Sequence, residues 1–174
     1  MATEKLTISL RNVITDAVAF LFILFVPALS HLTALPLYLL DPMRLAVLGV
    51  LLVTRDWKNT LALAVLLPLF STMVSGHPLF PKCLLISVEL ATNVLLLEGM
   101  IRLLGRRISN NGLVSGVSAF VSIVLSKALY YLLKWMVIAF GWMQMEVVST
   151  ALWIQLLVAL AISLVFALVA ARRR

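Results

Sequence analysis

Charged residues are scarce in this 174-residue chain: they account for 12% of it, whereas 63% is hydrophobic. A soluble domain carries about a quarter charged residues, so the composition excludes that class and indicates an integral membrane protein. The single cysteine, Cys83, excludes an internal disulfide and a cysteine-based metal site. Neither histidine has a partner at metal-ligand spacing, so we expect no metal site.

Catalytic and cofactor-binding motifs are also missing. The chain has no His-Glu-x-x-His, no Gly-x-Ser-x-Gly and no phosphate-binding glycine loop. We therefore expect no enzyme activity, no cofactor and no ATP hydrolysis by this chain itself.

The net charge of +7 does not by itself indicate a nucleic-acid-binding protein. The basic residues lie at the ends of apolar segments and not on a solvated face. Such residues set membrane topology and contact anionic lipid, so we expect membrane lipid, and no nucleic acid, among the partners.

Six apolar segments dominate the sequence, at about 13–30, 42–54, 59–75, 82–104, 113–140 and 147–171. A membrane-crossing helix needs about 20 apolar residues, fewer where its neighbours shelter it. The pattern predicts an all-α, polytopic six-helix bundle that forms a single transmembrane domain over residues 1–174. We interpret the first segment as an uncleaved signal anchor. The apolar connection 31–41, broken by Pro36 and followed by Pro42, predicts a lid or re-entrant piece packed on the outer end of the bundle. The two prolines and the glycine of 75–82 predict a structured loop.

The basic residues also predict the orientation of this bundle. With six crossings and an inner N-terminus, nearly all of them fall on the inner side: Lys5, Arg11, Arg55, Lys58, Arg102, Arg106, Arg107, Arg172, Arg173 and Arg174. The outer loops hold only Lys82, near their edge. The positive-inside rule then places both termini in the cytoplasm of a multi-pass protein of the cell (inner) membrane.

Polar side chains interrupt the fourth and fifth apolar segments, where ionisable groups are costly and mark functional sites by default. Helical spacing groups them on one face of each helix, and antiparallel packing should bring Glu89 level with Lys134 and Asn93 level with Lys127. We predict an outward-facing pocket for a small polar or anionic ligand. Its predicted ligand-binding residues are Glu89, Asn93, Lys127, Tyr130, Tyr131, Lys134, Arg44 and His77. The alternative is an ion pair between Glu89 and Lys134 that only locks two helices together.

Three further features have structural interpretations. Glu98 precedes Arg102 by four residues, the favourable order for an exposed helix pair. Asp16 suits either the positive N-terminal end of the first helix or a contact with a partner. Gly112 and Gly116 form a GxxxG pattern, which favours close helix packing within the bundle or, as the alternative, a contact with another chain.

This plan resembles the substrate-binding S components of energy-coupling factor (ECF) transporters. The shared features are six helices in a short chain, cytoplasmic termini, a proline-bounded first outer loop, and polar residues in the outer halves of helices four and five. The resemblance implies uptake of a vitamin-like or other micronutrient, with a transmembrane coupling subunit and ATPases as partners. It implies that the pocket is covered by two lids, residues 35–41 and 76–82, and is lined by Glu89, Asn93, Lys127, Tyr130 and Lys134. One departure is that the alanine-x-x-x-alanine motif of the family's first helix is absent.

A second class of protein fits the same plan. A six-helix chain of this size is similar to the rod-shape determining membrane proteins, which act as non-transporting scaffolds. In a scaffold, the buried polar residues would bind partner helices and not a solute.

Overall fold

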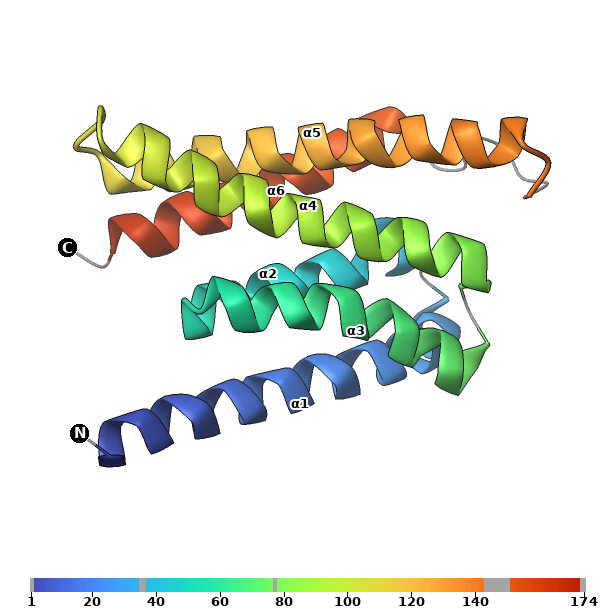
Figure 1. Ribbon diagram of the computed structural model, residues 1–174, viewed down its shortest axis with the longest axis horizontal. Coiled ribbons are helices and arrows are strands. Elements are labelled where there is room, and N and C mark those ends of the chain that lie inside the picture. The colour runs from blue at the N-terminus through green and yellow to red at the C-terminus, as the bar shows by residue number, and fades with distance from the viewer. Residues whose placement is uncertain (1, 35–36, 77, 143–150, 173–174) are drawn as a thin grey trace.

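A computed structural model describes residues 2–34, 37–76, 78–142 and 151–172 of the chain. Within these residues the fold is all-helical. It consists of a short 3₁₀ helix, η1 (Leu37–Leu40), and six α-helices: α1 (Ala2–Thr33), α2 (Pro42–Thr54), α3 (Trp57–Ser75), α4 (Phe80–Gly105), α5 (Asn111–Ala139) and α6 (Leu152–Ala171). The helices run alternately up and down, so the first turn of α1 and the last turn of α6 lie at the same end (Figure 1).

Five of the six helices are long and apolar enough to cross a membrane: α1 from Leu10, α3, α4, α5 and α6. The exception is α2, whose 13 residues extend roughly 20 Å at 1.5 Å per residue. That length is shorter than the roughly 30 Å hydrocarbon core of a bilayer. The structure therefore supports a membrane protein and accounts for five of the six predicted crossings by helix length.

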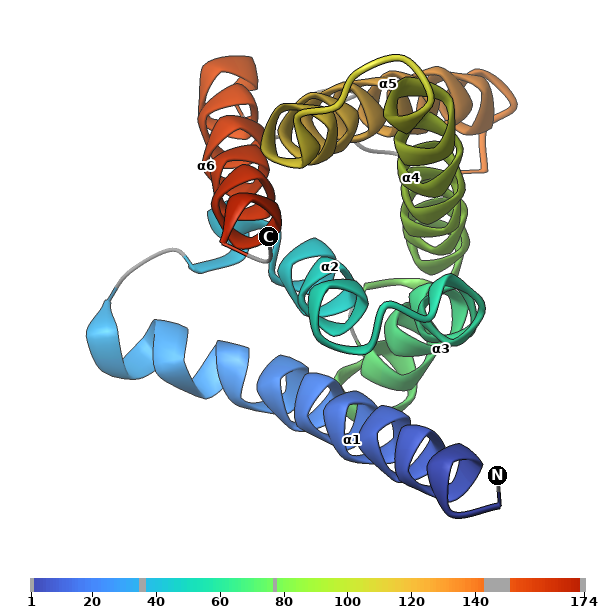
Figure 2. The same ribbon diagram turned by 90° about the vertical axis from the view of Figure 1, so that its left-hand side faces the viewer.

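The short α2 lies inside the bundle, between α1 and α3 on one side and α6 on the other (Figure 2). Val47 and Leu48 are each 1% exposed and contribute to two separate apolar cores, one with α1, α3 and α4 and the other with α4, α5 and α6. A helix surrounded in this way does not need to span the bilayer by itself, because neighbouring helices shelter its ends.

A proline marks the start of α2, and polar capping residues mark the starts of α3 and α5. Pro42 occupies the first turn of α2, as the sequence predicts, because its missing N–H is not needed there. The Asp56 carboxylate accepts hydrogen bonds from the backbone N–H groups of Lys58 (3.1 Å) and Asn59 (3.2 Å) and so caps α3. Asn110 caps α5 in the same way.

The start of α1 differs from the prediction of about residue 13. The helix begins at Ala2, and polar residues close to the predicted start are bonded to the α2–α3 turn. Arg11 donates to the backbone carbonyl of Thr54 (2.8 Å), and Asn12 donates to Asp56 (3.0 Å). Asp16 thus lies well inside α1, and its assignment to the helix N-terminus is wrong. Its carboxylate instead accepts a hydrogen bond from Asn59 of α3 at 3.0 Å.

The GxxxG pattern packs α5 against α6 within the bundle, as the first of its two interpretations predicts. A Cβ atom added at Gly112 would lie 3.1 Å from the backbone oxygen of Ala167. At Gly116 it would lie 2.9 Å from the Ala167 Cβ and 3.3 Å from the Ser163 backbone oxygen. Only glycine leaves room for this approach of the two helices.

Candidate functional site: a buried charge cluster

Asp41 connects η1 to α2 in an unusual conformation. Its φ of 52° is left-handed, a region that aspartate tolerates better than most residues. The side chain does not cap α2. The carboxylate instead lies 3.4 Å from Arg44 Nε and 3.2 Å from Lys127 Nζ. Asp41 therefore joins the start of α2 to the middle of α5.

Glu89 of α4 lies on the other side of the same two cations. Arg44 Nη2 donates to Glu89 Oε1, and Lys127 Nζ lies 2.9 Å from the same oxygen. Asp41, Arg44, Glu89 and Lys127 thus form one network from three helices, which we call the charge cluster. It contains two carboxylates and two cations, so each charge is balanced within the cluster.

The charge cluster has a buried pair, Arg44 and Glu89, and a partly exposed rim, Lys127 and Asp41. The side chains of Arg44 and Glu89 are 3% and 4% exposed, whereas those of Lys127 and Asp41 are 22% and 29% exposed. Burial on its own raises the pKa of the Asp41 carboxyl, but the Arg44 guanidinium and the Lys127 ammonium outweigh it. Together they hold the pKa below its usual value of 3.8. Asp41 is therefore a carboxylate at neutral pH, and Lys127 and Asp41 are the two members of the cluster with accessible side chains.

The ion pairs correct the predicted register of α4 against α5. Glu89 pairs with Lys127 and not with Lys134. Asn93 donates to Ser122 (3.1 Å) and is not paired with Lys127. The short inner turn explains the difference. Glu89 precedes the last residue of α4 by 105 − 89 = 16 positions, and Lys127 follows the first residue of α5 by 127 − 111 = 16 positions. The register is thus set by the turn, whereas the prediction counted from the outer ends of the helices.

Aromatic residues surround the cluster on the α5 side. The Tyr130 ring centre lies 5.4 Å from Lys127 Nζ and 5.9 Å from Lys134 Nζ, within the range of cation–π attraction. Lys134 is 1% exposed. The Tyr131 hydroxyl pairs with the Gln155 amide of α6 at 2.8 Å. These contacts extend the polar region from α2 through α5 to α6.

Below the cluster, the α4–α5 contact contains polar atoms that have no hydrogen-bond partner among the described residues. They are the side-chain oxygen of Asn93, which is 1% exposed, and the hydroxyl of Ser118, which is fully buried. Buried polar atoms in native proteins are nearly always paired. The polar region therefore continues along this contact towards the inner end.

Of the eight predicted site residues, the structure joins Arg44, Glu89 and Lys127 directly and places Tyr130, Tyr131, Lys134 and Asn93 around them. His77 lies outside the described residues. Sequence reasoning treated Asp41 only as part of a lid and did not single out Gln155. For Asp41 a signal was available: it precedes Pro42 at a helix start and lies three residues before Arg44, a spacing that brings two side chains together.

The arrangement is suited to exchanging one ionic partner for another. An anionic group reaching Lys127 can replace the Asp41 carboxylate, and a cationic group can pair with Asp41 in turn. Within the described residues, no three metal-binding side chains come together. No family model, no curated protein and no solved structure matches the chain.

Proposed function

We propose that this protein is a multi-pass inner-membrane subunit that binds a small polar or anionic solute, as the resemblance to ECF S components implies. The observation that carries the proposal is the charge cluster: four ionisable side chains from three helices gathered in the interior of a mainly apolar bundle. Such groups are costly in a membrane protein, and replacing a buried ion pair with apolar residues is often neutral or stabilising. An ion pair that only holds two helices together needs one carboxylate and one cation, whereas the charge cluster contains two of each.

The position of the cluster supports uptake from outside. Glu89 lies nearer the first residue of α4 than its last, in the half of the bundle that is remote from the chain termini. The positive-inside rule assigns the end that holds the termini to the cytoplasm. In this orientation the rim residues Lys127 and Asp41 face the outer half, beneath η1. Energy for uptake comes from partner ATPases through a transmembrane coupling subunit.

The test is native mass spectrometry on protein purified from its own host membrane. Wild-type protein should carry a bound small molecule, and Lys127→Met should lose it because the exposed cation of the rim is gone. Lys127→Arg, which keeps the charge, should retain part of it. Arg102→Met is a matched control, since Arg102 is 63% exposed in its pair with Glu98 and should keep the ligand in full. A ligand content that is equal in all four proteins would contradict the proposal.

One observation favours the second candidate, a scaffold similar to rod-shape determining membrane proteins. The positive and negative charges of the cluster already balance one another, as they would in ion pairs that only hold helices together. A scaffold should carry no small molecule in any variant. It should instead lose partner proteins when Lys127 is changed, because in a scaffold the polar residues bind partner helices and not a solute.

A further inference from the structure

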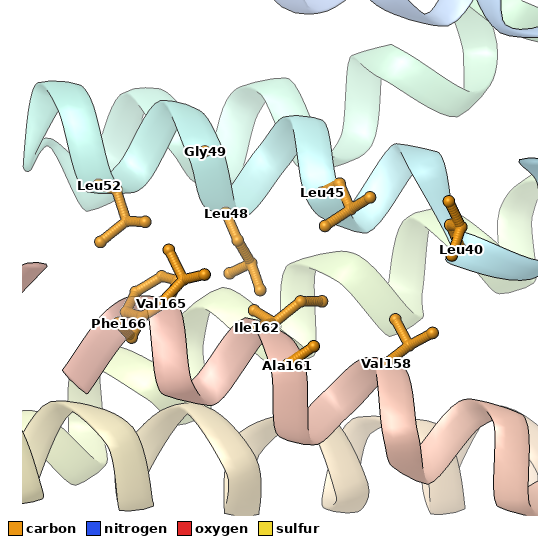
Figure 3. A pocket seen from close by; sticks show the side chains of 10 residues that line it. All are labelled: Leu40, Leu45, Leu48, Gly49, Leu52, Val158, Ala161, Ile162, Val165 and Phe166. Carbon is orange, nitrogen blue, oxygen red and sulfur yellow. The ribbon is translucent and has the colours of Figure 1, made fainter. Parts of the chain in front are cut away.

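An apolar groove of about 270 Å³ runs between α2 and α6. Leu45, Leu48 and Leu52 of α2 form one wall, and Ile162 and Phe166 of α6 form the other (Figure 3). Gly49 leaves the groove open, because a Cβ atom added there would meet nothing within 4 Å. The two helices stand apart here, and the lining of the groove is almost entirely apolar.

One end of this groove adjoins the charge cluster. Leu40 lines that end, opposite Val158 (Figure 3), and the next residue is Asp41 of the cluster rim. On the α6 side, Gln155 lies one helical turn before Val158 and is bonded to Tyr131 of α5. Polar residues at the start of α2, on α5 and on α6 thus lie next to the residues that line this end of the groove.

We propose that the charge cluster and the groove form one amphipathic binding site, for a free single-chain carboxylate with a linear hydrocarbon tail. The inference rests on the proposed function, that the cluster is a ligand site, and names its ligand class. The carboxylate takes the place of Asp41 on Lys127, the partly exposed cation of the cluster. The tail lies along α2 towards Leu52 and Phe166.

The dimensions of the groove favour one tail and not two. An apolar cavity of about 150 Å³ holds a benzene ring, so about 270 Å³ holds a chain of roughly ten carbons. A second groove of about 370 Å³, between α1 and α2, is also mainly apolar, but the first α2 residue in its lining is Leu45, and it lacks Leu40, the neighbour of Asp41. Charge complementarity at the mouth therefore assigns the ligand to the α2–α6 groove.

The experiment measures decanoate binding to the full-length protein in phosphatidylcholine nanodiscs. Decanol, which lacks the charge, and butanoate, which lacks most of the tail, serve as comparison probes. Decanoate should bind to wild type, and each of the other two should bind about tenfold more weakly or worse. Equal binding of decanoate and decanol would contradict a carboxylate site.

Two variants locate the tail. Ala161→Phe fills the groove from an exposed position of α6, and Gly49→Leu fills it from α2 without a clash. Either change should weaken decanoate binding by about tenfold or more, while Ala62→Phe, at an exposed position of α3 away from the groove, should leave it unchanged. Decanoate binding that survives both groove variants would overturn the proposal. So would a phospholipid that copurifies with wild type and is lost from Ala161→Phe, because the occupant would then be a bilayer lipid.

The two proposals fail in different ways. If wild type does not bind decanoate but its native small molecule is still lost from Lys127→Met, the amphipathic ligand class is wrong and the polar site stands. If wild type neither binds decanoate nor carries any small molecule, both proposals are wrong.

Discussion

Glu89 and Glu98 lie on the same helix, and each carboxylate pairs with a cation, but in different surroundings. Glu89 is almost fully buried between two cations, whereas Glu98 pairs with an arginine that is 63% exposed. Solvent screens the Glu98 pair, and the pair costs side-chain entropy to hold. Removing Glu89 instead leaves Arg44 and Lys127 with one carboxylate fewer in a medium that solvates cations poorly.

We therefore expect Glu89→Gln to lower the free energy of unfolding by about 3–5 kcal/mol. Glu98→Gln should lower it by less than about 1 kcal/mol. Urea or thermal unfolding of both variants in the same detergent measures the difference. Similar losses in the two variants would show that the surroundings of Glu89 are better solvated than its burial indicates.

Asp41 allows a prediction on pH, because the neighbouring cations hold its pKa below the usual 3.8. A carboxyl whose pKa is depressed in the folded state stabilises the protein above its unfolded pKa and loses this effect as the pH falls through the folded value. Asn tolerates the left-handed conformation and lacks the charge, so Asp41→Asn isolates this contribution. The difference in unfolding free energy between wild type and Asp41→Asn should stay constant from neutral pH to about pH 5. It should disappear only below about pH 4. A difference that fades between pH 7 and pH 5 would place the Asp41 pKa above its usual value.

Among the helices, the contact between α5 and α6 depends on two glycines, and Gly116 is the closer fit. Gly116→Ala should destabilise the protein by about 1–3 kcal/mol, because the new methyl group meets Ala167 and the Ser163 backbone. Gly99→Ala is the matched control in α4, since a Cβ there meets nothing within 4 Å. It should be neutral or stabilise by up to about 1 kcal/mol through helix propensity. Unfolding midpoints of the two variants in one detergent test the order; equal midpoints would show that α6 shifts freely to accommodate the methyl group.

The helix ends could be predicted where the sequence itself stops the helix. Pro42 begins α2 and Gly76 ends α3, and the structure agrees with both predicted positions. The start of α1 at Ala2 could not be predicted by the same means, because residues 2–12 contain no proline or glycine. Arg11 and Asn12 in this part of the helix bond to a turn more than forty residues later. The amino-acid composition of the first segment alone does not indicate this contact with the α2–α3 turn.

The candidate site could be predicted in its residues but not in its pairing. Polar residues in apolar helices pointed to Glu89 and Lys127 because buried charge is rare in a membrane. Their partnership depended on the register of α4 against α5, which the inner turn determines. Arg44 was predicted as a ligand-binding residue, but its ion pair with Glu89 was not predicted. That pair forms because the short α2 lies inside the bundle, where the first turn of α2 contacts α4.

For the molecule as a whole, the orientation in the membrane is the prediction that most needs an experiment. In a Cys83→Ser background, Leu79→Cys and Ser109→Cys place single thiols at exposed positions in two successive connections, on either side of α4. A membrane-impermeant maleimide should label Leu79→Cys in intact cells and Ser109→Cys only after the membrane is opened. The reverse pattern would invert the bundle and place the charge cluster on the cytoplasmic side.

The central claim is that the charge cluster binds a solute and is not a helix clasp, and the double variant Glu89→Gln, Lys127→Met tests it most directly. This variant removes one charge of each sign and leaves Asp41 paired with Arg44, so the interior stays balanced. Unfolding and native mass spectrometry are measured on the same preparation. We predict that stability recovers to within about 1 kcal/mol of wild type while the bound small molecule is lost. Recovery of stability with the small molecule retained in full would contradict the claim.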